Sequence, residues 1–88
     1  MAELTRTLRL GHVGADVFAA KRMVARYLRD GPVKDSRAAR TFGPYFAIRV
    51  NTVRRRENMK PTGVFDQPLL DTMRDGGFVD AYSDSLLA

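Results

Sequence analysis

The sequence contains no cysteine and only one histidine, and both facts narrow the chemistry open to the protein. Without cysteine there are no disulfides, thiolate zinc sites or cysteine nucleophiles, although the redox compartment stays undetermined. His12 is a lone imidazole with no carboxylate cluster around it in the sequence. A metal site needs several such ligands, so we expect neither a metal nor another cofactor.

Long apolar runs are also missing. No run approaches the roughly 20 residues that a helix needs to cross a bilayer, so we do not expect a membrane as a partner. Residues 1–11 include Glu3 and lack the apolar stretch of about seven or more residues that a secretory signal contains. We therefore expect no signal that the ordinary export machinery reads.

The 88 residues present are enough for one domain with a small core. Residues 1–73 hold 14 basic side chains against seven acidic ones, whereas residues 74–88 hold one against three. A basic body favours anionic partners such as phosphate polymers, nucleic acid or an acidic protein surface. Because no helix-turn-helix pattern or aromatic-rich sheet motif is present, we do not expect nucleic acid.

Glycine and proline divide the chain into helices. Gly14 precedes a first helix that we expect to begin near residue 15 or 16 and to end near residue 29 or 30, before Gly31 and Pro32. Residues 31–41 show no sustained period, which predicts a loop with a short turn around residues 36–40.

The second predicted helix begins at Pro44 and ends near residue 57 or 58, where Asn58 is suited to a left-handed terminator. Asp66 is the expected N-cap of a third helix over about residues 67–74, which Gly76 and Gly77 stop. Apolar spacing gives each helix one buried stripe. The expected core residues are Val17, Ala20, Val24, Tyr27, Leu28, Phe46, Ala47, Val50, Val53, Leu69, Leu70 and Met73.

The last segment, residues 76–88, is too apolar for a solvated linker. Its large apolar side chains are Phe78, Tyr82, Leu86 and Leu87. On a soluble monomer they would form an exposed apolar patch, which favours association with another chain. We therefore predict that these four residues are assembly contacts, buried against another chain.

Two segments share a pattern of turn and core residues with a known family. The matching residues are Leu8, Leu10, Gly11, Gly14, Asp16 and Val17, followed by Phe42, Gly43, Pro44, Val50, Thr62, Gly63, Val64 and Asp66. On these positions, residues 8–73 resemble the three-helix peptidoglycan-binding domain often attached to bacterial and phage cell-wall hydrolases. The resemblance implies an all-α fold, a compact three-helix bundle over residues 8–75 with arms at residues 1–7 and 76–88.

The family's two recurrent glutamines are replaced by Lys21 and Arg54, and its alanine by Arg49. Glutamines near the helix interface are candidates to contact ligand, so the two changes to a cation either remove a ligand groove or alter its preference. The candidate ligand- or partner-binding residues are Tyr45, Arg49, Arg54, Arg55, Arg56 and Lys21.

The arginine run has two interpretations. It can simply favour the negative C-terminal end of the second helix, or it can contact teichoic phosphate or an acidic protein surface. Tyr45 likewise has two interpretations: its ring either stacks on a sugar or has no role in binding. The positions of Tyr27 and Phe46 in the apolar stripes favour the core for both.

Three aspartates near the third helix are not predicted to be catalytic. Asp66 is expected to cap, and Asp71 and Asp75 lie four residues apart on a solvent-facing side of one short helix. Because no nucleophile with a base is recognisable, we predict that the protein is not an enzyme.

Two functions of different classes remain. The first is a non-catalytic structural protein of a phage particle, of the capsid or tail accessory (decoration) type, which reuses the fold to bind neighbouring subunits through the C-terminal arm and the basic face. The second is a stand-alone cell-wall-binding module that anchors a lytic enzyme or particle to peptidoglycan, which places it at the bacterial wall rather than in the virion. The sequence shows neither a hydrolase domain nor an export signal, so the particle is the preferred expectation.

Overall fold

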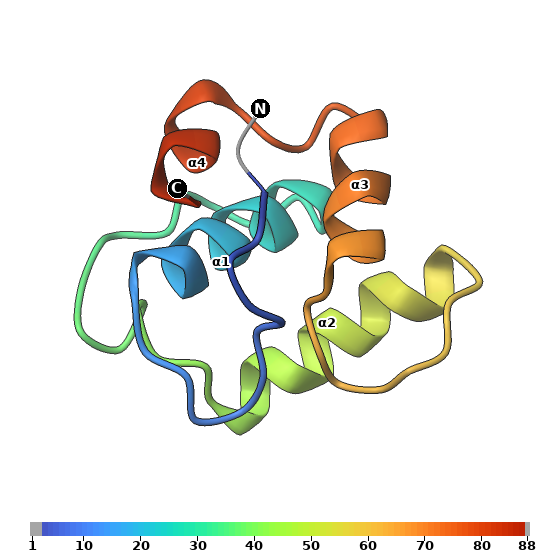
Figure 1. The fold of residues 1–88 in the computed structure, drawn as a ribbon, viewed down its shortest axis with the longest axis horizontal. Helices are drawn as coiled ribbons and strands as arrows, with labels where there is room; N and C mark the ends of the chain where they lie inside the picture. Colours follow the sequence, from blue (N-terminus) through green and yellow to red (C-terminus); the bar gives the residue numbers. More distant parts are fainter. Residues whose placement is uncertain (1–2, 88) are drawn as a thin grey trace.

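The computed structural model describes residues 3–87, which fold around one central helix (Figure 1). The helices are α1 (Ala15–Tyr27), α2 (Pro44–Arg56), α3 (Gln67–Asp75) and α4 (Ala81–Leu86). In Figure 1, α1 lies in the middle, α2 crosses beneath it, and α3 and α4 lie above on either side. The expectation of a compact all-α protein is confirmed for the described residues, with α4 as an addition to the three predicted helices.

The starts of α2 and α3 lie where the sequence predicts them. Pro44 is the first residue of α2, where a missing N–H costs nothing. Asp66 caps α3, because its carboxylate accepts a hydrogen bond of 3.2 Å from the backbone N–H of Leu69. At α1 the N-cap is Gly14 without a side-chain cap, and Asp16 in the first turn accepts from the N–H of Val17 at 2.9 Å.

Three helices end in the same way, with a residue in the left-handed region just beyond the last turn. Asn58 (φ 57°) follows α2 and Gly77 (φ 80°) follows α3, which confirms both predicted stops. After α1 this place belongs to Arg29 (φ 59°), so the helix ends at Tyr27, two or three residues earlier than predicted. The N–H of Asp30 then bonds the carbonyl of Ala25 at 2.8 Å.

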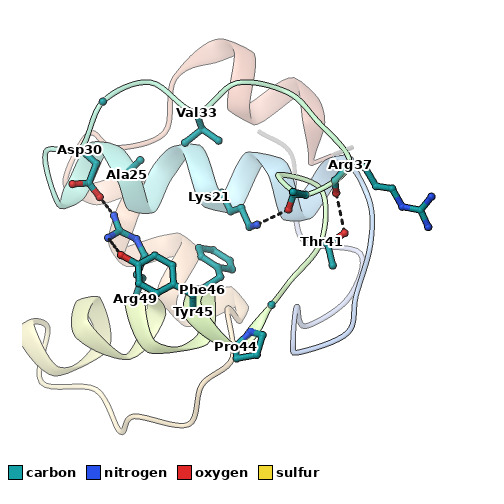
Figure 2. Close-up of a pocket in the computed structure, with 13 residues that line it drawn as sticks. Lys21, Ala25, Asp30, Val33, Arg37, Thr41, Pro44, Tyr45, Phe46 and Arg49 are labelled. Atoms are coloured by element: carbon teal, nitrogen blue, oxygen red, sulfur yellow. Dashed lines mark hydrogen bonds and ion pairs between the residues drawn. The ribbon is translucent and has the colours of Figure 1, made fainter.

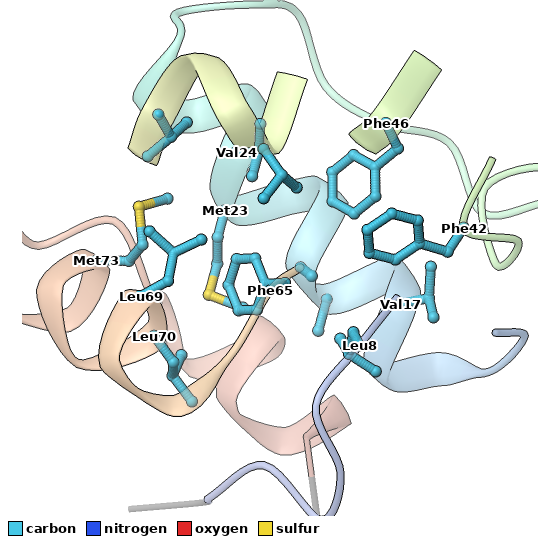
Figure 3. Close-up of a cluster of buried hydrophobic side chains, with 14 of the residues drawn as sticks. Leu8, Val17, Met23, Val24, Phe42, Phe46, Phe65, Leu69, Leu70 and Met73 are labelled. Carbon is cyan, nitrogen blue, oxygen red and sulfur yellow. The ribbon is translucent and has the colours of Figure 1, made fainter. Parts of the chain in front are cut away.

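The core lies between α1, α2 and α3 (Figure 3). Most predicted stripe residues are buried there, and Tyr27, Leu28 and Ala47 are half-buried at its margin. Phe42 and Phe46 meet edge to face with ring centroids 4.7 Å apart. The buried core residues are Leu8, Val17, Ala19, Ala20, Met23, Val24, Phe42, Phe46, Val50, Val53, Phe65, Leu69, Leu70, Met73 and Leu87.

The N-terminal segment is tied to the turn before α3. Leu8 and Phe65 exchange two backbone hydrogen bonds of 2.9 Å as an isolated antiparallel bridge, and both side chains are fully buried. Leu4 packs against the same core. The division into arms at residues 1–7 and 76–88 stays a prediction, and Met1, Ala2 and Ala88 of those arms lie outside the described residues.

The C-terminal arm folds back on its own chain, and this corrects one expectation. Leu87 is 1% exposed and belongs to the core, so it is not available to a neighbouring chain. Phe78 packs on Tyr27 with ring centroids 4.8 Å apart, and Leu86 is half-buried. The arm therefore completes a small core that three helices leave open, while Tyr82 alone of the four stays largely exposed, at 51%.

Asp80 fixes the arm to α1 by polar contacts. Its carboxylate caps α4 by accepting from the N–H of Ser83 at 2.7 Å, and it accepts from Arg22 at 2.8 Å and Arg26 at 2.6 Å. These contacts, led by the Ser83 N–H, hold the pKa of Asp80 below its ordinary value in spite of partial burial.

Candidate functional site

A groove of about 830 Å³ opens between α1, the first turn of α2 and the segment that joins them (Figure 2). Its volume lies in the range typical of small-ligand sites, about 300–1,000 Å³. The lining is mostly apolar, with a few polar and charged side chains. The lining residues are Lys21, Ala25, Asp30, Gly31, Val33, Arg37, Ala38, Thr41, Gly43, Pro44, Tyr45, Phe46 and Arg49.

The first turn of α2 supplies the aromatic wall. Phe46 is buried and joins the groove to the core, whereas Tyr45 is 69% exposed at the mouth. Pro44 begins α2, so both rings lie in the first turn of the helix. One ring is thus held by packing and the other is free to meet a ligand.

Lys21 enters the groove from α1. Its Nζ donates a hydrogen bond of 2.9 Å to the carbonyl oxygen of Ala38 and lies 5.5 Å from the centre of the Phe46 ring. The side chain is half-buried, and this burial lowers its pKa from the ordinary value of 10.5. The groove therefore holds a half-buried ammonium group whose hydrogen bond goes to a backbone carbonyl.

Arg49 closes one end of the groove. It forms an ion pair with Asp30, which follows α1, and its Nη1 donates to the Tyr45 hydroxyl oxygen at 3.4 Å. The guanidinium carbon lies 5.5 Å from the centre of the Tyr45 ring. Figure 2 shows this chain of contacts from Asp30 through Arg49 to Tyr45, which orients the exposed ring.

Three of the six predicted binding residues, Lys21, Tyr45 and Arg49, thus lie together in one groove. Arg55 and Arg56 are exposed at the far end of α2 and do not line it. Whether any of these residues binds a ligand or partner stays a prediction.

Arg54 corrects the expected basic face, because its side chain is buried. It is 5% exposed, its Nε donates to the carbonyl oxygen of Lys60 at 2.6 Å, and its Nη1 reaches the carbonyl oxygen of Val64 at 3.2 Å and Asp66 at 3.0 Å. The guanidinium spans the turn between α2 and α3. It holds that turn in place and cannot also meet an anionic partner.

The segment joining α1 and α2 is the part of the site that sequence reasoning missed. Val33, Ala38 and Thr41 come from residues expected to form only a connecting loop. The predicted turn is present, since the N–H of Arg40 bonds the carbonyl of Ser36 at 3.1 Å. The sequence signal that this loop packs over the groove was Val33, an apolar residue directly before Lys34 and Asp35.

Acidic side chains do not gather into a cluster that could hold a metal ion in the described part of the chain. Within residues 3–87 no three His, Cys, Asp or Glu side chains are placed to hold a metal ion. Asp71 accepts from the side-chain amide of Gln67 at 2.9 Å, as an ordinary surface contact. No helix formed by residues 3–87 combines the length and apolarity needed to span a bilayer.

Together, the fold and the groove describe a small helical domain whose described residues form an open, largely apolar groove. No family model and no curated protein match this chain. Among solved structures, the chain is similar to a periplasmic domain of the EpsAB fusion protein of the Vibrio vulnificus type II secretion system, with a TM-score of 0.71 and 25% sequence identity. The similarity covers 94% of this chain and 34% of that one, so this chain spans about a third of the length of its structural neighbour.

Proposed function

We propose that this protein is a non-catalytic module that binds peptidoglycan in the bacterial wall through the groove between α1 and α2. The observation that carries the proposal is the meeting of Lys21, Tyr45 and Arg49 in one apolar cleft of ligand size. These residues were singled out from the sequence for binding, and the fold brings Lys21 of α1 to Tyr45 and Arg49, which lie one turn apart on α2. An exposed ring, a cation and a largely apolar lining are the usual components of a small-molecule site.

The fold supports the same proposal. The glycine and aspartate pattern of residues 8–73 resembles the peptidoglycan-binding domain, and its N-cap at Asp66 and its left-handed turn at Gly63 are both formed. The structural neighbour is described as a periplasmic domain, and peptidoglycan lies in the periplasm. Under this proposal α1, α2 and α3 form a peptidoglycan-binding-like bundle, and α4 is an additional helix that packs against α1.

The role in a phage particle stays a prediction, and it has less support from the structure than from the sequence alone. It depended on an apolar tail available to another chain and on a basic face that included Arg54. Leu87 and Arg54 are both buried within this chain. Its remaining candidate contacts are Tyr82, Arg55 and Arg56.

Co-sedimentation with purified peptidoglycan sacculi tests the proposal. We expect the protein to pellet with sacculi at low ionic strength and Tyr45→Ala to bind about tenfold more weakly, as loss of a stacked ring in a ligand cleft predicts. Tyr82→Ala is the matched control, because Tyr82 is an exposed tyrosine outside the groove. A wild-type protein that stays in the supernatant at low salt ends the proposal and leaves the particle role as the better candidate.

A further inference from the structure

Lys21 enters the groove and has no ion pair with an acidic side chain in the described part of the chain. Among residues 3–87 its side chain makes one hydrogen bond, to the carbonyl oxygen of Ala38. Arg49 is neutralised by Asp30, and the Arg37 side chain points out of the groove (Figure 2). An ammonium group carries three donors, so two remain for a ligand.

The rest of the lining does not suit a sugar. A glycan presents many hydroxyl groups, which side-chain amides and hydroxyls usually bind. The lining contains no Asn or Gln, and the Thr41 hydroxyl already donates to the carbonyl oxygen of Arg37 at 2.9 Å. The Tyr45 hydroxyl accepts from Arg49, which is paired with Asp30, and much of the remaining lining is alkyl and aromatic surface from Val33, Pro44 and Phe46.

From this combination, and resting on the proposed function, we propose that the groove binds the peptide part of peptidoglycan rather than its sugar chain, with a peptide carboxylate paired to the Lys21 ammonium group. The methyl side chains of the wall peptide lie against the apolar lining. The proposal concerns a departure of this chain from the family it resembles, which has a glutamine at this position.

The carboxylate is favoured over a phosphate by the number and type of cations. Phosphate groups are usually held by an arginine fork or by several cations together. The groove offers one free lysine, and its guanidinium groups are either paired or turned away. Burial also lowers the pKa of Lys21, and an incoming carboxylate adds a negative charge to the contact that the Ala38 carbonyl already makes.

A two-ligand titration of the full chain tests this inference. The first probe is a synthetic wall stem pentapeptide with free carboxylates, and the second is the same peptide with every carboxyl group amidated. Binding is followed by backbone amide shifts in nitrogen-15 NMR spectra. We expect shifts that cluster on the groove residues, and about tenfold weaker binding of the amidated peptide.

Variants at Lys21 assign the effect to one side chain. Lys21→Gln should weaken binding of the acidic peptide about tenfold and leave binding of the amidated peptide unchanged, whereas Lys21→Arg should keep most of the affinity. Lys60→Gln is the matched control, since it makes the same change at an exposed position outside the groove. If Lys21→Gln loses NMR signal dispersion, the amidated peptide on wild-type protein still decides the question.

The inference and the proposed function fail in different ways. Equal binding of the two peptides, or tighter binding of a neutral N-acetylglucosamine tetramer, overturns the inference even when the protein pellets with sacculi. A protein that binds the acidic peptide through Lys21 but does not pellet with sacculi supports the groove chemistry and overturns the wall-binding proposal.

Discussion

Three neighbouring arginines show how much a single position on a helix decides. Arg54, Arg55 and Arg56 look alike in the sequence, yet only Arg54 points inward, where its guanidinium bonds two carbonyls and Asp66. Consecutive residues on a helix differ by about 100° in direction, so one of three adjacent side chains faces the core side. Which of the three it is depends on how α2 packs, and the run itself does not reveal it.

Replacing Arg54 should therefore be costly. Arg54→Met keeps an apolar stem but leaves the Asp66 carboxylate and two carbonyl groups without their donor, which should lower the free energy of unfolding by about 2–4 kcal/mol. Arg55→Met removes the same group from an exposed position and should change it by less than about 0.5 kcal/mol. Urea unfolding followed by circular dichroism measures both, and equal losses would contradict the buried role of Arg54.

Gly63 should be another sensitive single position. Its backbone is left-handed (φ 77°) and its N–H donates to the Asn51 side chain at 2.7 Å. A Cβ there has room, with the nearest atom 4.0 Å away, so Gly63→Ala should cost only the backbone strain of about 1–2 kcal/mol. Gly31→Ala, at an open position outside the left-handed region, should be neutral or slightly stabilising. Thermal unfolding of the two variants checks the difference, and similar shifts in both would disprove it.

At the scale of whole elements, the sequence predicts helices where local chemistry marks their ends. Pro44, Asp66, Asn58 and Gly77 each act through their own backbone or side chain, so these boundaries could be read in advance. Arg29 gave no such signal, since nothing about arginine favours a left-handed backbone.

The fourth helix was missed because it has only six residues, too few to show a period. Its signal was local: Asp80 stands three residues before Ser83, whose N–H it caps. The groove could be predicted only in part from the sequence. Lys21, Tyr45 and Arg49 stood out as side chains, but their meeting depends on the packing of α1 against α2 and on a loop without periodicity.

Because the segment containing α4 packs against the rest of the chain, we predict that this packing stabilises the fold. Leu87→Ala removes a side chain that is 1% exposed in the core, so it should lower the free energy of unfolding of the isolated chain by about 2–4 kcal/mol. Leu10→Ala is the matched control, because Leu10 is 59% exposed, and it should cost less than about 0.5 kcal/mol. Chemical unfolding at two protein concentrations tests this. A Leu87→Ala chain as stable as wild type would mean that the arm gains its stability elsewhere, as the assembly prediction requires.

For the whole molecule, ion pairs join segments that are distant along the chain. Arg6 pairs with Asp16, Arg54 with Asp66, and Arg22 and Arg26 with Asp80. Each of these pairs crosses between two parts of the fold, and among these carboxylates the pKa of Asp80 is lowered by its contacts. Stability should therefore fall in acid as Asp80 takes up a proton.

Asp80 is the carboxylate with which to test this dependence. Its pKa in the folded protein lies below the ordinary 3.8, first because the Ser83 N–H donates to it and also because Arg22 lies beside it, against the opposing effect of burial. A lowered pKa means that the folded state binds the proton less readily than the unfolded state. The stability contributed by the charged form is thus fully present above about pH 5 and is lost as the pH falls through the lowered value.

Asp80→Asn separates the charge from the helix cap, because asparagine also caps well and only the ion pairs to Arg22 and Arg26 are removed. At about pH 7 the variant should unfold with a free energy lower by about 1 kcal/mol, a modest value because these groups are partly exposed. Between about pH 5 and pH 2 the two curves should converge, since wild-type Asp80 becomes neutral there too. Urea unfolding across this range measures the difference, and a gap that stays constant down to the lowest pH would show that the Asp80 charge does not hold α4 to α1.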